Sequence, residues 1–120
     1  VSHKHNADPS RIYLTGMSMG GEGSWDALTY YPDLFAAALI LNGAGDPRAM
    51  GRVTKLPIRF YHGRADKITP VANSRELAAS LHELGALAHY TELRWAGHDI
   101  RDRVYTRANF AWLLQQRRTD

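Results

Sequence analysis

The stretch GMSMG, residues 16–20, follows the apolar run RIYLT (11–15) and precedes the glycine-rich segment GEGSW (21–25). It reads G-x-S-x-G between a segment that favours a β-strand and a segment that can open a helix. In that context the pattern is typical of a strand that turns sharply into a helix and holds the serine at the tip of the turn. The sequence therefore predicts that Ser18 lies at a tight strand-to-helix junction in a strained backbone conformation.

This turn brings a strand and a helix close together. We expect glycine at positions 16 and 20 because side chains there would collide where the two elements approach each other. The amino terminus of the helix points at Ser18, so the backbone N–H of Met19 can donate a hydrogen bond to an oxyanion that develops there. Glycine and serine are common residues, so the pattern alone is a weak signal. The strand before it and the helix start after it strengthen the prediction.

The composition predicts one domain over residues 1–120. Of the 120 residues, 44% are apolar and 22% are charged, which is ordinary for a folded protein with its own core. The net charge of +3 comes from scattered basic residues. No basic stripe alternates with aromatic residues, so we expect no nucleic-acid partner. The longest apolar run, 34–41, is far too short to span a membrane, and we expect no membrane partner.

The chain contains no cysteine. Disulfides, cysteine-based zinc sites and a cysteine nucleophile are therefore excluded. His3 and His5 lie two residues apart in a polar lead-in, a spacing that in a tail rarely forms a metal site, and we expect no metal and no cofactor. No signal peptide is visible, and the sequence leaves the cellular compartment open.

Strand-like and helix-like segments alternate along the chain. Strands are predicted at 11–15, 37–41, 58–62 and 89–94, and helices at 19–31, 71–84 and 104–116, with at most a short helix within 47–56. This alternation predicts the α/β class, with a three-layer parallel sheet of about four strands and flanking helices. Apolar spacing predicts that three residues of each helix face the sheet: Trp25, Leu28 and Tyr31; Leu77, Leu81 and Leu84; Phe110, Leu113 and Leu114.

Three residues follow the carboxyl ends of predicted strands, where open parallel sheets form their sites. They are Ser18, Asp66 and His98. A serine hydroxyl is a poor nucleophile until a base removes its proton, and neutral imidazole is the natural base near neutral pH. A carboxylate can hold the imidazole in one tautomer and stabilise the imidazolium that forms. The three residue types in this order therefore predict nucleophilic catalysis.

Other residues compete for these roles. Asp46 also follows a predicted strand and is the main alternative acid, although Asp66 stands one tight turn past its own strand. Asp99 is next to His98 in the chain, too close to orient that ring from behind. His62 falls within or at the end of a strand, which favours a packed or hydrogen-bonded histidine. A turn-stabilising aspartate and a loop histidine remain the structural alternatives for Asp66 and His98.

Several segments resemble one superfamily in order and spacing. They are DPSRIYLTGMSMGG (8–21), YPDLFAA (31–37), HGRAD (62–66), TPV (69–71) and GHD (97–99). The chain looks like the serine esterases of the α/β-hydrolase superfamily. The most similar group is that of the prolyl-oligopeptidase-like, polyhydroxybutyrate-depolymerase-like and feruloyl-esterase-like enzymes. The resemblance implies that Ser18 is the nucleophile, Asp66 the orienting acid and His98 the base, with no cofactor.

The resemblance covers the carboxyl-terminal half of the fold. Members of the family carry further strands before the turn, including a loop that supplies a second oxyanion-hole N–H. The sequence therefore predicts a truncated α/β-hydrolase fold in which strand 11–15 lies at an edge of the sheet. An edge strand with unpaired backbone groups is a template for association. We expect either a homo-oligomer, in which a second copy of the chain pairs with this strand, or an amino-terminal partner segment that pairs with it.

Two functions fit these observations. The first is a serine hydrolase of the carboxylesterase type, which cleaves short-chain or aryl carboxylic esters of small molecules through an acyl-enzyme. In it Trp95 and Asn42 could line the substrate pocket, whereas core packing is expected for Trp25. The second is a non-catalytic or split hydrolase fragment that binds or assembles with an amino-terminal partner. Neither the ester nor its acyl length can be read from the sequence.

Overall fold

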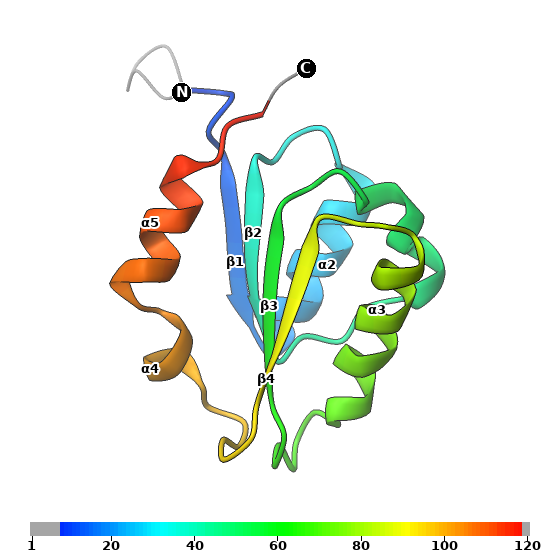
Figure 1. The fold of residues 1–120 in the computed structure, drawn as a ribbon, viewed down its shortest axis with the longest axis vertical. Helices are drawn as coiled ribbons and strands as arrows, with labels where there is room; N and C mark the ends of the chain where they lie inside the picture. The colour runs from blue at the N-terminus through cyan, green and yellow to red at the C-terminus, as the bar shows by residue number, and fades with distance from the viewer. Residues whose placement is uncertain (1–7, 119–120) are drawn as a thin grey trace.

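The computed structural model describes residues 8–118, which form a four-stranded parallel sheet. The strands are β1 (Tyr13–Met17), β2 (Ala37–Leu41), β3 (Ile58–Gly63) and β4 (Ala88–Leu93), and they lie in the order β1-β2-β3-β4. All neighbouring pairs are parallel, so the carboxyl ends of the strands meet at one end of the sheet, the lower end in Figure 1. The predicted α/β class and parallel sheet are confirmed.

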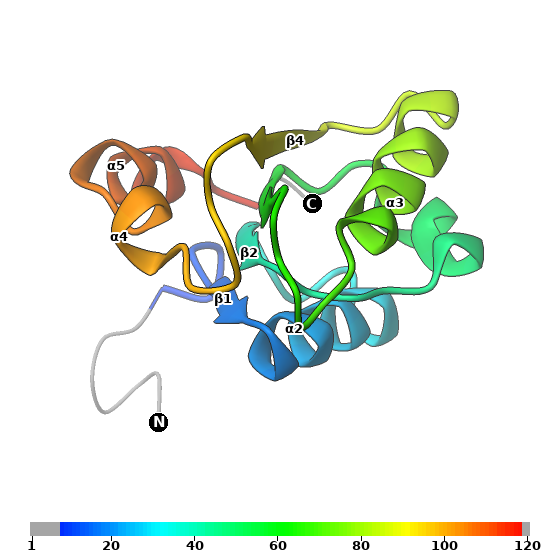
Figure 2. The same cartoon turned by 90° about the horizontal axis from the view of Figure 1, so that it is seen from below.

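Helices cover both faces of this sheet (Figures 1 and 2). The first face carries α2 (Met19–Tyr30), the 3-10 helix η1 (Pro47–Val53) and α3 (Val71–Glu83), and the second carries α4 (Arg101–Val104) and α5 (Arg107–Gln115). The result is the expected three-layer arrangement. Among residues 8–118, no helix combines the length and the apolar character that crossing a bilayer would need.

Strand β2 lies inside the sheet and is buried along its whole length. Successive side chains of a strand point to opposite faces, so Ala38 and Ile40 belong to the core under α2 and α3, whereas Ala37, Leu39 and Leu41 belong to the core under α4 and α5. Burial on both faces explains why this segment is apolar without alternation.

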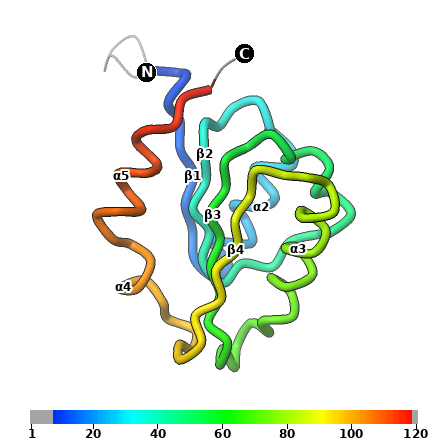
Figure 3. Tube along the Cα trace, viewed as in Figure 1, coloured from blue at the N-terminus to red at the C-terminus, as the bar shows by residue number. Residues whose placement is uncertain are grey.

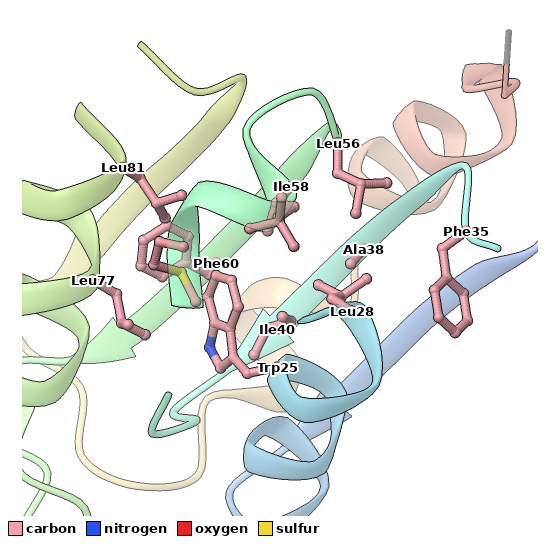
Figure 4. Packing of buried hydrophobic residues seen from close by; sticks show 12 residues of the cluster. Trp25, Leu28, Phe35, Ala38, Ile40, Leu56, Ile58, Phe60, Leu77 and Leu81 are labelled. Atoms are coloured by element: carbon pink, nitrogen blue, oxygen red, sulfur yellow. The ribbon is translucent and has the colours of Figure 1, made fainter. Parts of the chain in front are cut away.

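The larger core lies under α2 and α3 and is shown in Figure 4. Its centre is the edge-to-face contact of Trp25 with Phe60, whose ring centroids are 5.2 Å apart at 82°. This geometry is one that aromatic pairs prefer. Leu28 from α2 and Leu77 and Leu81 from α3 pack into the same cluster. The inward placement predicted for these side chains is confirmed.

Some predicted boundaries and faces are wrong. The first strand begins two residues later than predicted, after a turn in which the Asp8 carboxylate accepts the Ser10 N–H, and it extends through Met17, which pairs with Leu41. Tyr31 is exposed, because α2 ends at Tyr30 before Pro32. Leu84, just past the end of α3, is exposed too.

The predicted last helix, 104–116, is observed as α5 and begins three residues later than predicted, and the short helix α4 before it was not predicted. The Thr106 hydroxyl accepts the Asn109 N–H and so caps a new helix, α5, two residues after α4 ends. The face of α5 that packs inward carries Asn109 and Leu113. Phe110 and Leu114 are exposed, and the prediction that they face the sheet is wrong.

Strand β1 lies at one edge of the sheet. Within residues 8–118 it pairs with β2 alone, and Figure 3 shows the trace leaving it directly for α2. Helix α5 covers one face of β1 rather than its edge, since Tyr13 and Met17 of β1 pack in the same cluster as Leu113 of α5. The edge position predicted for this strand is the one observed.

Candidate active site

Ser18 stands alone between β1 and α2. Its φ of 59° and ψ of −116° lie in a region that non-glycine residues rarely adopt. Two backbone hydrogen bonds hold it there, from the Ser18 N–H to the Leu41 carbonyl and from the Glu22 N–H to the Ser18 carbonyl, both at 2.9 Å. The strained conformation predicted for this serine is thus present, and neighbouring structure stabilises it.

The glycines around Ser18 differ in what a side chain at each position would contact. A Cβ added to Gly16 would lie 2.3 Å from the Gly20 carbonyl oxygen, so the collision predicted at Gly16 is confirmed. A Cβ at Gly20 would meet no atom within 4 Å, so the prediction for Gly20 is wrong. The contact falls one residue later, at Gly21, where a Cβ would lie 2.8 Å from the Leu41 carbonyl oxygen and 2.9 Å from Gly43 Cα. Gly21 is on the buried face of α2, and Gly20 is on the exposed face.

Met19 is the first residue of α2. Its backbone N–H is among the first four of the helix, which have no acceptor within it. The Met19 side chain is 84% exposed and takes no part in the core. Donation by this N–H to a substrate oxyanion stays a prediction.

Asp66 and His98 contact each other directly. The Nδ1 atom of His98 is 2.9 Å from Oδ2 of Asp66. The Asp66 side chain is 0% exposed and that of His98 is 19% exposed. The other Asp66 oxygen, Oδ1, accepts the backbone N–H groups of Ile68 at 2.8 Å and Thr69 at 2.9 Å. The carboxylate is therefore fixed in orientation, and one edge of the imidazole reaches the surface.

The pKa of the Asp66 carboxyl lies below its ordinary value. Burial raises this pKa, but hydrogen bonds from the Thr69 N–H, His98 and the Ile68 N–H together outweigh the burial. Asp66 is therefore ionised at neutral pH and accepts a proton donor on each oxygen. An ionised acceptor at Nδ1 keeps the proton of a neutral His98 on that nitrogen and leaves Nε2 as the basic atom.

Backbone contacts align the two loops that carry this pair. The Arg64 N–H donates to the Leu93 carbonyl at 2.9 Å, and the Ala65 N–H donates to the Ala96 carbonyl at 3.0 Å. A Cβ added to Gly63 would lie 1.9 Å from the Gly97 carbonyl oxygen. The turn after β3 thus lies against the loop after β4, and both are at the lower end of the sheet in Figure 1.

Asn42 is a residue whose role the sequence reasoning missed. It follows β2 with a φ of 48°, and its side chain is fully buried. Its Oδ1 accepts the Gly63 N–H at 3.0 Å, and its Nδ2 donates to the His98 carbonyl. The prediction that Asn42 lines a pocket is therefore wrong. The signal was available as a polar residue directly after an all-apolar strand, which must find buried partners.

Asn42 and its neighbour also relate Ser18 to His98. The Leu41 carbonyl accepts the Ser18 N–H. The side chain of Asn42, the residue after β2, donates to the His98 carbonyl. Ser18 and His98 are thus held by two consecutive residues at the carboxyl end of β2. Within residues 8–118, the Ser18 hydroxyl and His98 Nε2 make no hydrogen bond.

The competing residues lie elsewhere or are already occupied. Asp46 caps η1, because its carboxylate accepts the Arg48 N–H. The same carboxylate pairs with the Arg48 side chain. Asp99 pairs with Arg101. Both nitrogens of the buried His62 have partners. His3 and His5 lie outside the described residues.

Trp95 is 85% exposed, after the end of β4. Together with Arg64, Ala65 and Arg94 it lines a shallow hollow of about 490 Å³. The guanidinium of Arg94 lies 6.0 Å from the centre of the Trp95 ring. Of the three residues considered for a pocket, Trp95 faces solvent near the Asp66 and His98 loops, and Trp25 is in the core.

Solved structures with this fold are numerous. The structure of a thermostable esterase matches with a TM-score of 0.90 and 36% sequence identity, over 98% of this chain and 34% of the esterase chain. The chain belongs to the α/β-hydrolase superfamily. It spans about a third of the length of that relative.

Two further matches show the same α/β-hydrolase fold at lower identity. Esterase PE8 matches with a TM-score of 0.76 and 23% identity, over 94% of this chain and 54% of its own. An acylaminoacyl peptidase of Pyrococcus horikoshii matches with a TM-score of 0.75 and 23% identity, over 84% of this chain and 22% of its own. No model of a protein family matches this α/β-hydrolase sequence, and no curated protein matches it either.

Proposed function

We propose that this chain carries the catalytic residues of a serine hydrolase that cleaves carboxylic esters, short-chain or aryl, through an acyl-enzyme. The observation that carries the proposal is the 2.9 Å hydrogen bond between His98 Nδ1 and the buried Asp66 carboxylate, at the same end of the parallel sheet as a strained serine in a strand-to-helix turn. A charged acceptor behind an imidazole whose other nitrogen is free is what a serine nucleophile requires. The 36% identity to a thermostable esterase supports the same chemistry.

The roles follow from the atoms available. Ser18 Oγ attacks the ester carbonyl carbon while its proton passes to His98 Nε2, and Asp66 stabilises the imidazolium through Nδ1. The Met19 N–H donates to the oxyanion of the tetrahedral intermediate. When this intermediate collapses, the C–O bond to the alcohol breaks, and the alcohol takes the proton from Nε2. Water then repeats the sequence on the acyl-enzyme and releases the acid and Ser18.

The hollow beside Trp95 suits an aromatic part of the substrate. An exposed indole offers a flat apolar surface on which an aryl group can stack, and Trp95 is 85% exposed. The loop of Trp95 is also the loop of His98, so a group held on the indole would lie near the base. A stacking surface of this kind favours aryl esters over simple alkyl esters.

The alternative function is that of a hydrolase part that acts only with a partner segment. Two observations favour it: among the described residues one edge of β1 has no partner strand, and the chain covers about a third of the thermostable esterase. In that case the partner would pair with β1 and supply the second oxyanion donor.

Labelling with a fluorophosphonate probe tests the proposal, because the probe reacts with a serine that a histidine activates. We expect one label, on Ser18, and none in the Ser18→Ala and His98→Ala variants. Labelling elsewhere, or equal labelling of wild type and His98→Ala, would contradict the proposed triad. A chain that is folded by circular dichroism yet unlabelled would favour the alternative.

A further inference from the structure

His62 is a buried histidine that the proposed reaction does not use. It is on β3, and its side chain is 0% exposed. Its Nδ1 lies 2.7 Å from Ser74 Oγ, and its Nε2 lies 2.8 Å from the Thr69 carbonyl oxygen. The same Nε2 is 3.3 Å from Oδ2 of Asp66, the oxygen that also contacts His98.

The partners of His62 determine where its proton is. A carbonyl oxygen only accepts hydrogen bonds, so Nε2 carries a hydrogen that points to Thr69 and Asp66. In a neutral ring Nδ1 then accepts the hydroxyl hydrogen of Ser74. The imidazole is thereby held at both ends, with its Nε2–H on the buried side of the Asp66 carboxylate.

Oδ2 of Asp66 consequently lies between two imidazoles. His98 contacts it from the partly exposed side at 2.9 Å, and His62 contacts it from the buried side at 3.3 Å. Thr69 closes the network, because its N–H donates to Oδ1 of Asp66 while its carbonyl accepts from His62. Rotation of the carboxylate would break contacts on both of its oxygens.

We propose that His62 is a positioning residue that acts through Asp66: its Nε2–H holds Oδ2 in the orientation that His98 needs and withdraws part of the negative charge from that oxygen. The inference rests on the proposed function, since Asp66 and His98 act there as acid and base. It assigns to His62 a role distinct from packing. Loss of the Nε2–H should change the basicity of His98 as well as the stability of the fold.

Two amide substitutions separate these roles. In His62→Gln the amide nitrogen can take the place of Nε2, so the donor to Thr69 and Asp66 is kept. In His62→Asn the shorter amide reaches the position of Nδ1 near Ser74, and the donor to Asp66 is lost. Both variants introduce a primary amide at one buried site, so His62→Gln is the matched control for His62→Asn.

We expect kcat on a p-nitrophenyl ester to fall about 10- to 100-fold in His62→Asn with KM within about twofold, because misplaced catalytic groups cost rate more than binding. The acid limb of the pH profile should move to higher pH, since Asp66 without the second donor stabilises the imidazolium of His98 more strongly. His62→Gln should keep kcat within about fivefold and leave the acid limb in place. Equal losses in both variants with an unchanged limb would overturn the proposal and assign His62 to packing.

A measurement without substrate keeps this test separate from the proposed function. We expect the proton between His98 Nδ1 and Asp66 to give a low-field NMR resonance whether or not the protein hydrolyses esters. We expect His62→Asn to shift or broaden this resonance and His62→Gln to preserve it, with thermal unfolding followed in parallel. An unaltered resonance in a folded His62→Asn protein would refute the positioning role, and an inactive wild type that shows these shifts would refute only the proposed function.

Discussion

No side chain separates Gly63 from Gly97: a Cβ added to Gly63 would lie 1.9 Å from the Gly97 carbonyl oxygen. These residues stand three before Asp66 and one before His98 in the sequence. The contact between two backbones therefore sets the spacing of the loops that carry Asp66 and His98. A change at Gly63 should affect both stability and catalysis.

Gly63→Ala should lower the free energy of unfolding by about 1–3 kcal/mol, because the loop after β4 must move to admit the methyl group. It should also reduce kcat/KM by at least about tenfold, since His98 moves with that loop. Gly23→Ala is the control, because a Cβ at Gly23 meets no atom within 4 Å. In helix α2 that change should stabilise by up to about 1 kcal/mol. Urea unfolding and ester assays of both variants check the prediction, which fails if Gly63→Ala behaves like Gly23→Ala.

Ser18→Ala should abolish ester hydrolysis and leave the fold intact. The Ser18 hydroxyl makes no hydrogen bond within residues 8–118, so its removal leaves no buried partner unsatisfied. Loss of a triad member typically lowers turnover by several orders of magnitude. Activity on p-nitrophenyl acetate and the thermal midpoint are the two measurements. A variant that keeps more than a few per cent of the activity would exclude Ser18 as the nucleophile.

Asp66→Asn should damage turnover far more than Asp46→Asn. The amide can fill the same buried space, but it cannot stabilise an imidazolium and can favour the wrong tautomer of His98. Asp46 contacts Arg48 rather than a histidine, so its substitution should leave kcat within about twofold. The reverse ranking of kcat would move the acid to the end of β2.

Acid stability should depend on Asp66. Its pKa in the folded protein is below the ordinary value of 3.8, so the native state holds the ionised form more strongly than the unfolded chain does. The stability that this provides is fully present above about pH 5 and is lost as the pH falls through the lowered pKa. Between about pH 5 and pH 2, the free energy of unfolding should fall less steeply in Asp66→Asn than in wild type. Parallel curves from urea titrations would contradict this.

Within residues 8–118 one edge of β1 has no partner strand, which predicts association of this chain. A strand with one row of unpaired backbone groups can pair with a second copy or with a separate segment. Light scattering after size exclusion should detect a dimer or larger species at micromolar concentration. Thr15, an exposed residue of β1, is a site for Thr15→Pro, which should weaken edge pairing. A monodisperse monomer with full esterase activity would refute the prediction.

Sequence reasoning succeeded where one local pattern decided the outcome. The bounds of β2 were predicted residue for residue, because an apolar run between two turns has few ways to be anything but a buried strand. Asp66 and His98 were predicted as a pair because both follow parallel strands, whose carboxyl ends meet, and because the surrounding motifs resemble those of α/β-hydrolases.

Prediction from the sequence failed where tertiary contacts determine the local structure. The break before α5 depends on Asn109, whose buried amide bonds to the Val104 carbonyl and whose oxygen accepts from Arg59. Apolar spacing instead predicted a helix that already begins at residue 104, with Phe110 inward. The partners of His62 and Asn42 lie on other elements, so no spacing in the sequence could reveal them.

The positive φ of Ser18 lowers the stability of the fold at the same residue that is proposed to act as nucleophile. A glycine there would relieve a backbone cost of about 1–3 kcal/mol, so selection for stability alone would favour glycine. The proposed role of its hydroxyl as nucleophile gives a reason for a serine at a position that strains the backbone. Interactions elsewhere in the fold must offset this backbone strain. One of them is the hydrogen bond from the Ser18 N–H to the Leu41 carbonyl of the buried strand β2. Thermostabilising substitutions elsewhere in the chain would therefore raise the free energy of unfolding and compensate for the strain at Ser18 without changing the site itself.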